Sequence, residues 1–386
     1  MPPTRPSRVV TSLPPGATEA GGIPQAASGL IRFRLAREIP LIFSARLSIT
    51  LVSPDPTAAS AKPKRLMTDL FHEIPGNPVP ERATSGDFVA HDGKRLRYAL
   101  FPATSHPFKG TVILLNGRNE CIEKYFETIR DLTVRGHAVA TFDWRGQGAS
   151  ERLLRDGHRG YVRSFDHYVR DLEAFFEQIV LPDCRGPFFL LAHSSGALIA
   201  LLAAPSMVNR VQRMVLVAPF LSVIGAPLSM KAISRIGTLL CWLGLGRLYA
   251  AWGPRPREGT PFEINKLTSD ERRYRRNMLL YETYPELSVG GPTIAWMRAA
   301  AQASEAVREP QFMAALKVPM LIVNAGADDV VSSRDVEQFA SQCRVASLLT
   351  IDGARHEILQ EADIYREQLL AAFTAFVPGT PATADA

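Results

Sequence analysis

Short apolar runs alternate along most of this chain with longer stretches in which apolar residues recur every three or four positions. Short, continuous apolar runs predict buried strands, and the 3.6-residue period predicts amphipathic helices. The helical period is clear in residues 120–135 and 166–180. Strands that alternate with helices predict a mostly parallel sheet with helices on both faces. We expect eight strands, at residues 87–90, 96–101, 111–115, 138–142, 188–191, 214–217, 320–323 and 347–351.

The alternation stops between residues 218 and 309, and this gap is too long for a plain loop. Met230, Ile233 and Leu240 recur there at helical spacing beside Trp242, so we expect a mostly helical cap. The apolar run 236–246 is too short to cross a bilayer, which needs about 20 residues. The predicted organisation is an extension (1–66), a core in two parts (67–218 and 309–378), a cap (219–308) and a flexible tail (379–386).

Ser194 stands where an apolar strand turns sharply into a helix rich in Ala and Leu. The turn follows the G-x-S-x-G pattern, with Ala192 in place of the first Gly. Small residues are needed because the turn is tight and the helix packs close to the strand. Such a turn exposes the serine hydroxyl above a helix N-terminus, which favours developing negative charge. The sequence therefore predicts Ser194 as a nucleophile.

A serine nucleophile in such a turn has an acid and a histidine that follow it in the chain. His356 is the one histidine after Ser194, and it follows an expected strand. The acid should follow the preceding strand, where Asp328 and Asp329 compete. Neighbouring side chains point apart, so one of them alone can orient the imidazole. We favour Asp328 and expect Asp329 to stabilise the loop or cap the next helix.

Ester or amide cleavage by a serine also needs donors for the oxyanion. One is the backbone N–H of Ser195, the residue after the nucleophile. The other is expected from the loop 116–120, where Gly117 allows a tight turn, and our candidate is the backbone N–H of Arg118.

Four blocks carry a family resemblance: residues 116–120 (NGRNE), 143–150 (DWRGQGAS), 192–196 (AHSSG) and 353–357 (GARHE). Together they resemble the bacterial lysophospholipase and monoacylglycerol lipase group of the α/β-hydrolase fold, often classed with serine aminopeptidase-like hydrolases. Stretches 156–160, 272–277 and 289–293 are similar to the lysophospholipase branch, and the resemblance covers residues 67–377.

The resemblance implies a serine hydrolase that cleaves the ester of a single-chain acyl lipid, above all a lysophospholipid. Monoacylglycerol, small esters and N-terminal prolyl peptides remain alternative substrates, and an inactive binding module is the alternative outside enzymes. No cofactor and no metal are expected. We expect the cap to line an acyl-chain pocket, with Trp144, Met230, Leu240 and Trp242 as substrate-binding candidates.

The cap also carries Arg272, Arg273, Arg275 and Arg276 close together. They could meet a phosphate headgroup or an anionic membrane surface. Alternatively, they form a solvated helix face that pairs with Asp270 and Glu271.

The formal net charge of +6 does not indicate nucleic-acid binding. Residues 1–66 hold nine Lys/Arg and three acids, and the rest of the chain holds 35 of each. The extension is rich in Pro, Ala, Ser and Arg, so it is expected to be disordered, a transit-type peptide, or sequence upstream of a true start at Met67.

The four cysteines show no disulfide or zinc spacing, which favours a cytoplasmic protein with reduced thiols. Peripheral contact with the inner face of the membrane is compatible with this location. The sequence leaves the oligomeric state open.

Overall fold

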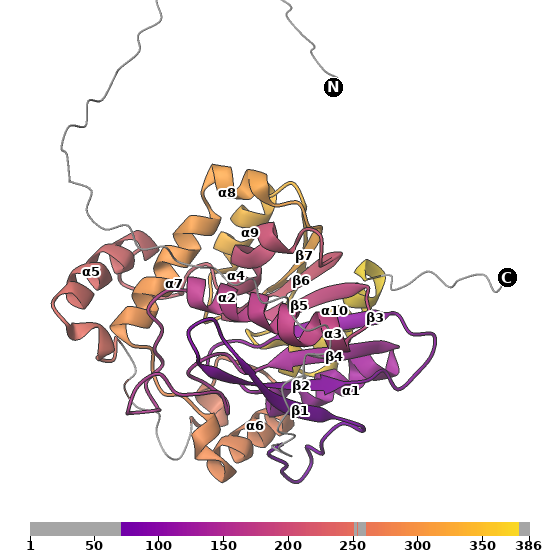
Figure 1. The fold of residues 1–386 in the computed structure, drawn as a ribbon. Helices are drawn as coiled ribbons and strands as arrows, with labels where there is room; N and C mark the ends of the chain where they lie inside the picture. The colour runs from indigo at the N-terminus through magenta and orange to yellow at the C-terminus, as the bar shows by residue number, and fades with distance from the viewer. Residues whose placement is uncertain (1–70, 251–252, 254–259, 378–386) are drawn as a thin grey trace, which may run out of the picture. The chain divides into compact units, whose positions relative to one another are not determined.

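Eight strands form a single sheet in the computed structural model, which describes residues 71–250, 253 and 260–377 (Figure 1). The strand order is β1-β2-β4-β3-β5-β6-β7-β8. Strand β2 runs antiparallel to β1 and β4, and all other neighbouring pairs are parallel. This confirms the predicted mostly parallel sheet. The strands are β1 (Thr84–Val89), β2 (Arg95–Phe101), β3 (Gly110–Leu115), β4 (His137–Phe142), β5 (Phe188–His193), β6 (Arg213–Val217), β7 (Met320–Ala325) and β8 (Ala346–Ile351).

Helices cover both faces of the sheet, because successive side chains of a strand point to opposite faces. Ile113 and Leu190 belong to the cluster that contains α2 (Asp166–Phe175), α4 (Ser195–Ala203) and α9 (Ser333–Gln342). Val112 and Leu191 belong to the cluster that contains α1 (Phe126–Val134) and α10 (Asp363–Phe376). Short helical segments complete the core: η1 (Ile122–Tyr125), the π-helical η2 (Phe176–Val180), α3 (Leu181–Asp183), η3 (Ala204–Met207) and η7 (Ile358–Gln360).

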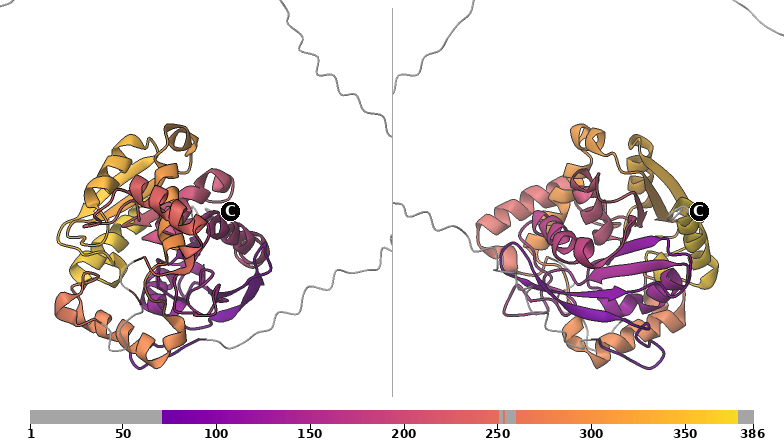
Figure 2. Two further views of the ribbon diagram at one scale, coloured as in Figure 1. Left: turned by 90° about the vertical axis from the view of Figure 1, so that its left-hand side faces the viewer. Right: turned by 45° about the vertical axis from the view of Figure 1, so that its right-hand side comes forward.

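The segment between β6 and β7 is mostly helical, as its pattern predicts. Helix α5 packs against α7, which also contacts α4, whereas α6 lies apart from this pair (Figure 2). Ser229, Asp270 and Thr293 each accept a backbone N–H at the start of α5, α6 and α7, which defines where these helices begin. The elements are α5 (Met230–Trp242), η4 (Leu245–Arg247), η5 (Phe262–Ile264), α6 (Glu271–Thr283), η6 (Pro285–Leu287), α7 (Ile294–Val307) and α8 (Pro310–Ala315).

Two of the predicted segments, the extension 1–66 and the tail 379–386, lie outside the described residues. The division of the remainder into core and cap stays a proposal. No helix in the described part of the chain is long and apolar enough to span a bilayer.

Candidate active site

Ser194 occupies the turn between β5 and α4 with a backbone φ of 52° and ψ of −117°, outside the ordinary regions for a non-glycine residue. The turn is tight because α4 approaches the end of β3 closely. A Cβ at Gly196 would lie 2.4 Å from the carbonyl oxygen of Asn116 and 2.7 Å from that of Leu115. The requirement for glycine two residues after the serine is therefore a packing requirement, as the sequence motif implies.

The structure brings Ser194, His356 and Asp328 together from three separate loops. The Nε2 atom of His356 lies 3.0 Å from Ser194 Oγ, and its Nδ1 atom lies 2.7 Å from Asp328 Oδ2. His356 follows β8 and Asp328 follows β7, so the parallel register of these strands delivers both to the same sheet edge. The neighbouring Asp329 is exposed and makes no hydrogen bond to His356 among those of the described residues.

Asp328 is held as a buried carboxylate. Its Oδ1 atom accepts the backbone N–H groups of Val330 and Val331 at 2.7 and 2.9 Å. Burial raises the pKa of Asp328, but the hydrogen bond to His356, its charge and the two backbone donors more than offset this and lower the pKa below its ordinary value. The carboxylate therefore stays ionised at neutral pH and can fix the imidazole orientation.

The loop expected to supply an oxyanion donor is held by its neighbours on both sides. Gln147 bridges it, because its Nε2 donates to the Gly117 carbonyl at 2.9 Å and its Oε1 accepts the Asn119 N–H at 3.1 Å. The Gly117 N–H donates to the Glu120 carboxylate. The guanidinium of Arg118 donates to the carbonyl oxygen of Gly290 and lies 5.6 Å from the Trp296 ring centre.

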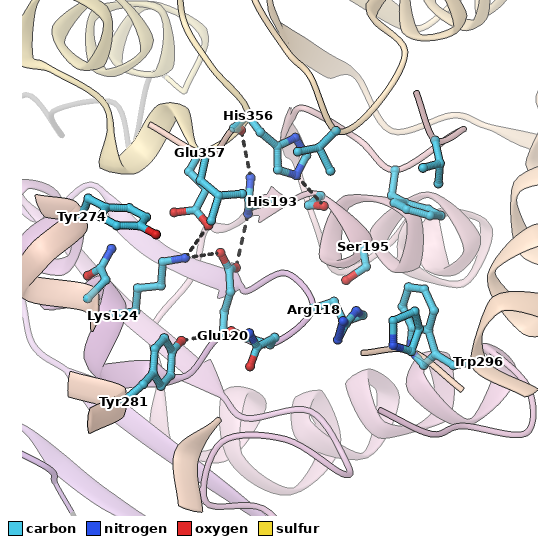
Figure 3. A pocket seen from close by; sticks show the side chains of 18 of the residues that line it. Arg118, Glu120, Lys124, His193, Ser195, Tyr274, Tyr281, Trp296, His356 and Glu357 are labelled. Atoms are coloured by element: carbon cyan, nitrogen blue, oxygen red, sulfur yellow. Dashed lines mark hydrogen bonds and ion pairs between the residues drawn. The ribbon is translucent and has the colours of Figure 1, made fainter. Parts of the chain in front are cut away.

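A group of buried charges lies beside His356 (Figure 3). Lys124 Nζ is 2.8 Å from Glu120 and 2.7 Å from Glu357, so it joins the two carboxylates. His193 Nδ1 is 3.2 Å from Glu120 Oε2, and its Nε2 is 3.2 Å from the carbonyl oxygen of His356. The sequence pattern did not reveal this cluster, because Glu120 and Lys124 at helical spacing resemble an ordinary surface pair.

A cavity of about 230 Å³ opens onto Ser194. Two kinds of side chain face it, and the polar ones include the buried charges (Figure 3). Besides Ser194 and His356, the remaining polar lining is Arg118, Asn119, Ser195, Tyr274, Asn277 and Tyr281. The apolar lining includes Phe220, Val223, Leu267, Met278, Trp296, Met297 and Val330.

None of the four substrate-binding candidates lines this cavity. Trp144 is buried against Phe142 and donates its indole N–H to the carbonyl of Asn116, so it supports the loop 116–120, the proposed oxyanion loop, instead. Met230 packs in the core, and Trp242 is 80% exposed on the outer side of α5. Leu240 lines a neighbouring apolar cavity of about 510 Å³, which shares Val223 and Met297 with the first. Helical periodicity identified α5 as amphipathic but not which residues face the serine.

Three of the cap arginines pair with acidic side chains, and contact of this group with a phosphate headgroup or a membrane surface stays a proposal. Arg273 is buried and pairs with Glu127, Asp270 and Asp363, and Arg276 pairs with Glu127. Their partners therefore include core residues beyond the neighbouring acids. Exposed Arg275 pairs with Glu271, four residues earlier on the same helix.

One group of side chains in the described part of the chain has ligand atoms close enough for a metal, namely His91, Asp92 and His167, within 4.8 Å of one another. Both Asp92 oxygens accept hydrogen bonds from Arg145. A metal ion would therefore have to compete with the Arg145 guanidinium for this carboxylate. None of the three lines the cavity at Ser194.

Residues 106–363 match the Hydrolase_4 family model, described as "Serine aminopeptidase, S33". Lysophospholipase L2 of Escherichia coli strain K12 is 34% identical over 307 residues, which cover 75% of this chain and 86% of the relative. The probable lysophospholipase L2 of Haemophilus influenzae is 30% identical over 69% of this chain and 83% of the relative. These matches confirm the resemblance.

The crystal structure of a soluble variant of monoglyceride lipase from Saccharomyces cerevisiae, in complex with a substrate analog, superposes with a TM-score of 0.61 at 22% identity. The superposition covers 78% of this chain and 97% of that chain. At this identity the likeness establishes a shared fold.

Proposed function

Since the chain belongs to the Hydrolase_4 family and is a carboxylic ester hydrolase with the α/β-hydrolase fold, we propose that it cleaves the acyl ester of a lysophospholipid through Ser194, His356 and Asp328. The observation that carries the chemistry is the continuous hydrogen-bonded chain from Ser194 Oγ through the His356 imidazole to Asp328. This chain lies at a cavity wall, where an ester could reach the hydroxyl.

In the first half of the reaction, Ser194 Oγ bonds to the ester carbonyl carbon as its proton passes to His356 Nε2. The negative oxygen that forms would be held by the backbone N–H groups of Ser195 and Arg118. When the intermediate collapses, the bond to the glycerol oxygen breaks, and His356 returns the proton to that oxygen. Asp328 stabilises the imidazolium between these two transfers.

In the second half, a water molecule gives a proton to His356 Nε2 and attacks the acyl group on Ser194. The bond to Oγ then breaks and Oγ recovers the proton. The products are a fatty acid and a glycerophospho headgroup, and the enzyme is regenerated without a cofactor.

Three features support a single-chain acyl lipid as the substrate. The apolar cavity behind α5 adjoins the cavity at Ser194 through Val223 and Met297, which offers an aliphatic chain an apolar site near the serine. The lysophospholipases L2 of two bacteria are 34% and 30% identical to this chain. The polar lining around Asn119, Asn277 and Tyr281 offers hydrogen bonds for the glycerol and headgroup side.

The outer face of the cap supports peripheral contact with a lipid surface. Leu239, Trp242 and Leu243 on α5 and its end are 56%, 80% and 55% exposed. Residues 219–250 contain Lys231, Arg235 and Arg247 but no acidic residue. Exposed aromatic and aliphatic side chains beside cations fit the interface of an anionic bilayer.

A substrate panel tests the proposed function. We expect the purified full chain to release fatty acid from lysophosphatidylcholine faster than from monoolein, short p-nitrophenyl esters or prolyl amides. Ser194→Ala should keep the wild-type circular dichroism spectrum and lose turnover of every ester. Preference for monoolein, short esters or prolyl amides would replace the proposed substrate, and turnover by Ser194→Ala equal to wild type would refute the mechanism. A wild-type chain inactive on the whole panel would favour a binding module.

A further inference from the structure

His193, the residue before the nucleophile, has an acceptor at each ring nitrogen. On one side, Nδ1 lies 3.2 Å from the Glu120 carboxylate, and on the other Nε2 lies 3.2 Å from the backbone carbonyl oxygen of His356. A backbone carbonyl can only accept a hydrogen bond, so Nε2 must carry a proton to bind it. The imidazole is 3% exposed. The Tyr125 hydroxyl also lies 3.4 Å from Nδ1, but it has a single proton, which it donates to Glu120 at 2.6 Å, so it is not the donor to this ring nitrogen.

Glu120 is occupied by donors that require its charge. It accepts hydrogen bonds from Lys124 and from the Tyr125 hydroxyl at 2.8 and 2.6 Å, and from the Gly117 N–H. Because these donors surround an acceptor-only carboxylate, Nδ1 of His193 must also donate in order to bind it. Burial raises the pKa of Glu120, but Lys124 and His193 more than offset this, so the pKa lies well below its ordinary value.

The charges in this cluster cancel. Glu120 and Glu357 supply two negative charges, and Lys124 and a protonated His193 supply two positive ones. A neutral His193 would leave the buried group with an uncompensated negative charge, which is costly away from water. Burial alone would lower the pKa of His193, but the Glu120 charge and hydrogen bond outweigh burial and raise the pKa.

We propose that Glu120 and a doubly protonated His193 form a buried ion pair that positions the oxyanion loop against the histidine loop. Glu120 fixes the Gly117 peptide, immediately before the proposed donor Arg118, and His193 fixes the His356 carbonyl. Both are positioning residues, because neither contacts the reacting ester atoms. The kinetic consequence of this inference rests on the proposed function, whereas the protonation state of His193 is independent of it.

The kinetic consequence is a loss of turnover rather than of substrate binding. Small displacements of an oxyanion donor or of the general base cost one to three powers of ten in rate. We expect Glu120→Gln, measured with p-nitrophenyl butyrate, to lower kcat about 10- to 100-fold and to change KM less than about threefold. The double variant Glu120→Gln, His193→Gln should lose no more than the worse single variant, because the two residues act as one unit.

Asp171→Asn is the matched control. Asp171 is a fully buried carboxylate that pairs with Arg145, and it does not line the cavity at Ser194. This substitution should lower the melting temperature and leave the kcat of the folded enzyme unchanged. If Glu120→Gln fails to fold, His193→Gln alone carries the kinetic test with the same expected loss.

The deciding experiment is nitrogen-15 NMR of the full chain labelled at histidine, with His193→Gln used to assign the signals. At pH 7.5 we expect both ring nitrogens of His193 to carry protons in the wild-type protein, and Glu120→Gln to convert the ring to a neutral tautomer. A neutral His193 in the wild type, or wild-type kcat in folded Glu120→Gln and His193→Gln, would overturn the inference. If the wild type cleaves no ester, the proposed function fails, while the NMR result still decides the ion pair.

Discussion

At the scale of single residues, the site depends on which of two adjacent aspartates faces the imidazole. Asp328 is buried and bonded to His356, whereas Asp329 is exposed one residue later. The two backbone donors from Val330 and Val331 turn the Asp328 side chain inward, because they bind the oxygen that does not contact His356. The sequence favours Asp328, and the loop geometry that turns its side chain toward His356 lies beyond what a sequence pattern shows.

We predict that Asp328→Asn lowers kcat about 10⁴-fold on p-nitrophenyl esters, because an amide favours the wrong imidazole tautomer and cannot stabilise the imidazolium. Asp329→Asn is its matched control and should stay within about twofold of wild type in kcat, since an exposed side chain without a bond to His356 has no such role. Stopped-flow or plate-based kinetics of both variants measure the difference. A larger loss in Asp329→Asn than in Asp328→Asn would contradict the assignment.

The residues of the site differ in how well the sequence predicts them. Ser194 and His356 follow from a local turn motif and from chain order, which are constraints of covalent connectivity. Trp144 and Trp242 were expected at the substrate, but one packs under the oxyanion loop and the other faces outward. A tryptophan is favoured equally by a core, a pocket or a lipid surface, so its type alone does not say which it occupies.

At the scale of elements, α6 is attached to the core by charge as well as by apolar packing. Arg273 is 3% exposed and reaches Glu127 in α1, Asp363 in α10 and the carbonyl of Glu361. Its neighbour Arg275, two residues on, points to solvent. Arginines that look alike in sequence therefore contribute differently to the free energy of unfolding, because the 3.6-residue helical period directs their side chains to different faces of α6.

We predict that Arg273→Met lowers the free energy of unfolding by about 1–3 kcal/mol, because it leaves the partly buried Glu127 and Asp270 carboxylates without this cation and the buried Glu361 carbonyl without a donor. Arg275→Met, on the same helix, should change it by less than about 0.5 kcal/mol, since its pair is exposed. Urea unfolding followed by circular dichroism gives both values. Equal effects of the two substitutions would show that α6 is not held by the Arg273 contacts.

At the scale of the whole described unit, helix α5 carries exposed apolar side chains on one face and lines a cavity beside the one at Ser194 with the other. The outer face of α5 carries exposed Leu239 and Trp242, and its inner residues Ile233 and Leu240 line the apolar cavity that adjoins the site. The sheet was predictable because strand and helix periods differ and repeat through the core. The orientation of the cap was not predictable, because an apolar stripe on a helix predicts that this face is buried but does not identify the element that covers it.

We predict that Leu239→Ser, Trp242→Ser reduces binding to vesicles of phosphatidylglycerol and phosphatidylcholine at least fivefold in a sedimentation assay. Loss of two exposed apolar side chains removes much of the area that could enter the interface. Turnover of a soluble p-nitrophenyl ester should remain within about twofold of wild type, because neither residue lines the cavity at Ser194. Val134→Ser, also at an exposed apolar position but on α1, is the control. Unchanged vesicle binding in the double variant would remove α5 as the contact surface.

The most direct test of the central claim, that Ser194 is activated as a nucleophile by His356 and Asp328, is covalent capture. The wild-type chain would be treated with a fluorophosphonate, digested and analysed by tandem mass spectrometry. We predict one phosphonylated peptide with the added mass on Ser194, no adduct in Ser194→Ala, and a much slower reaction in His356→Gln. An adduct on another residue, or equally fast labelling of Ser194 in His356→Gln, would contradict the account.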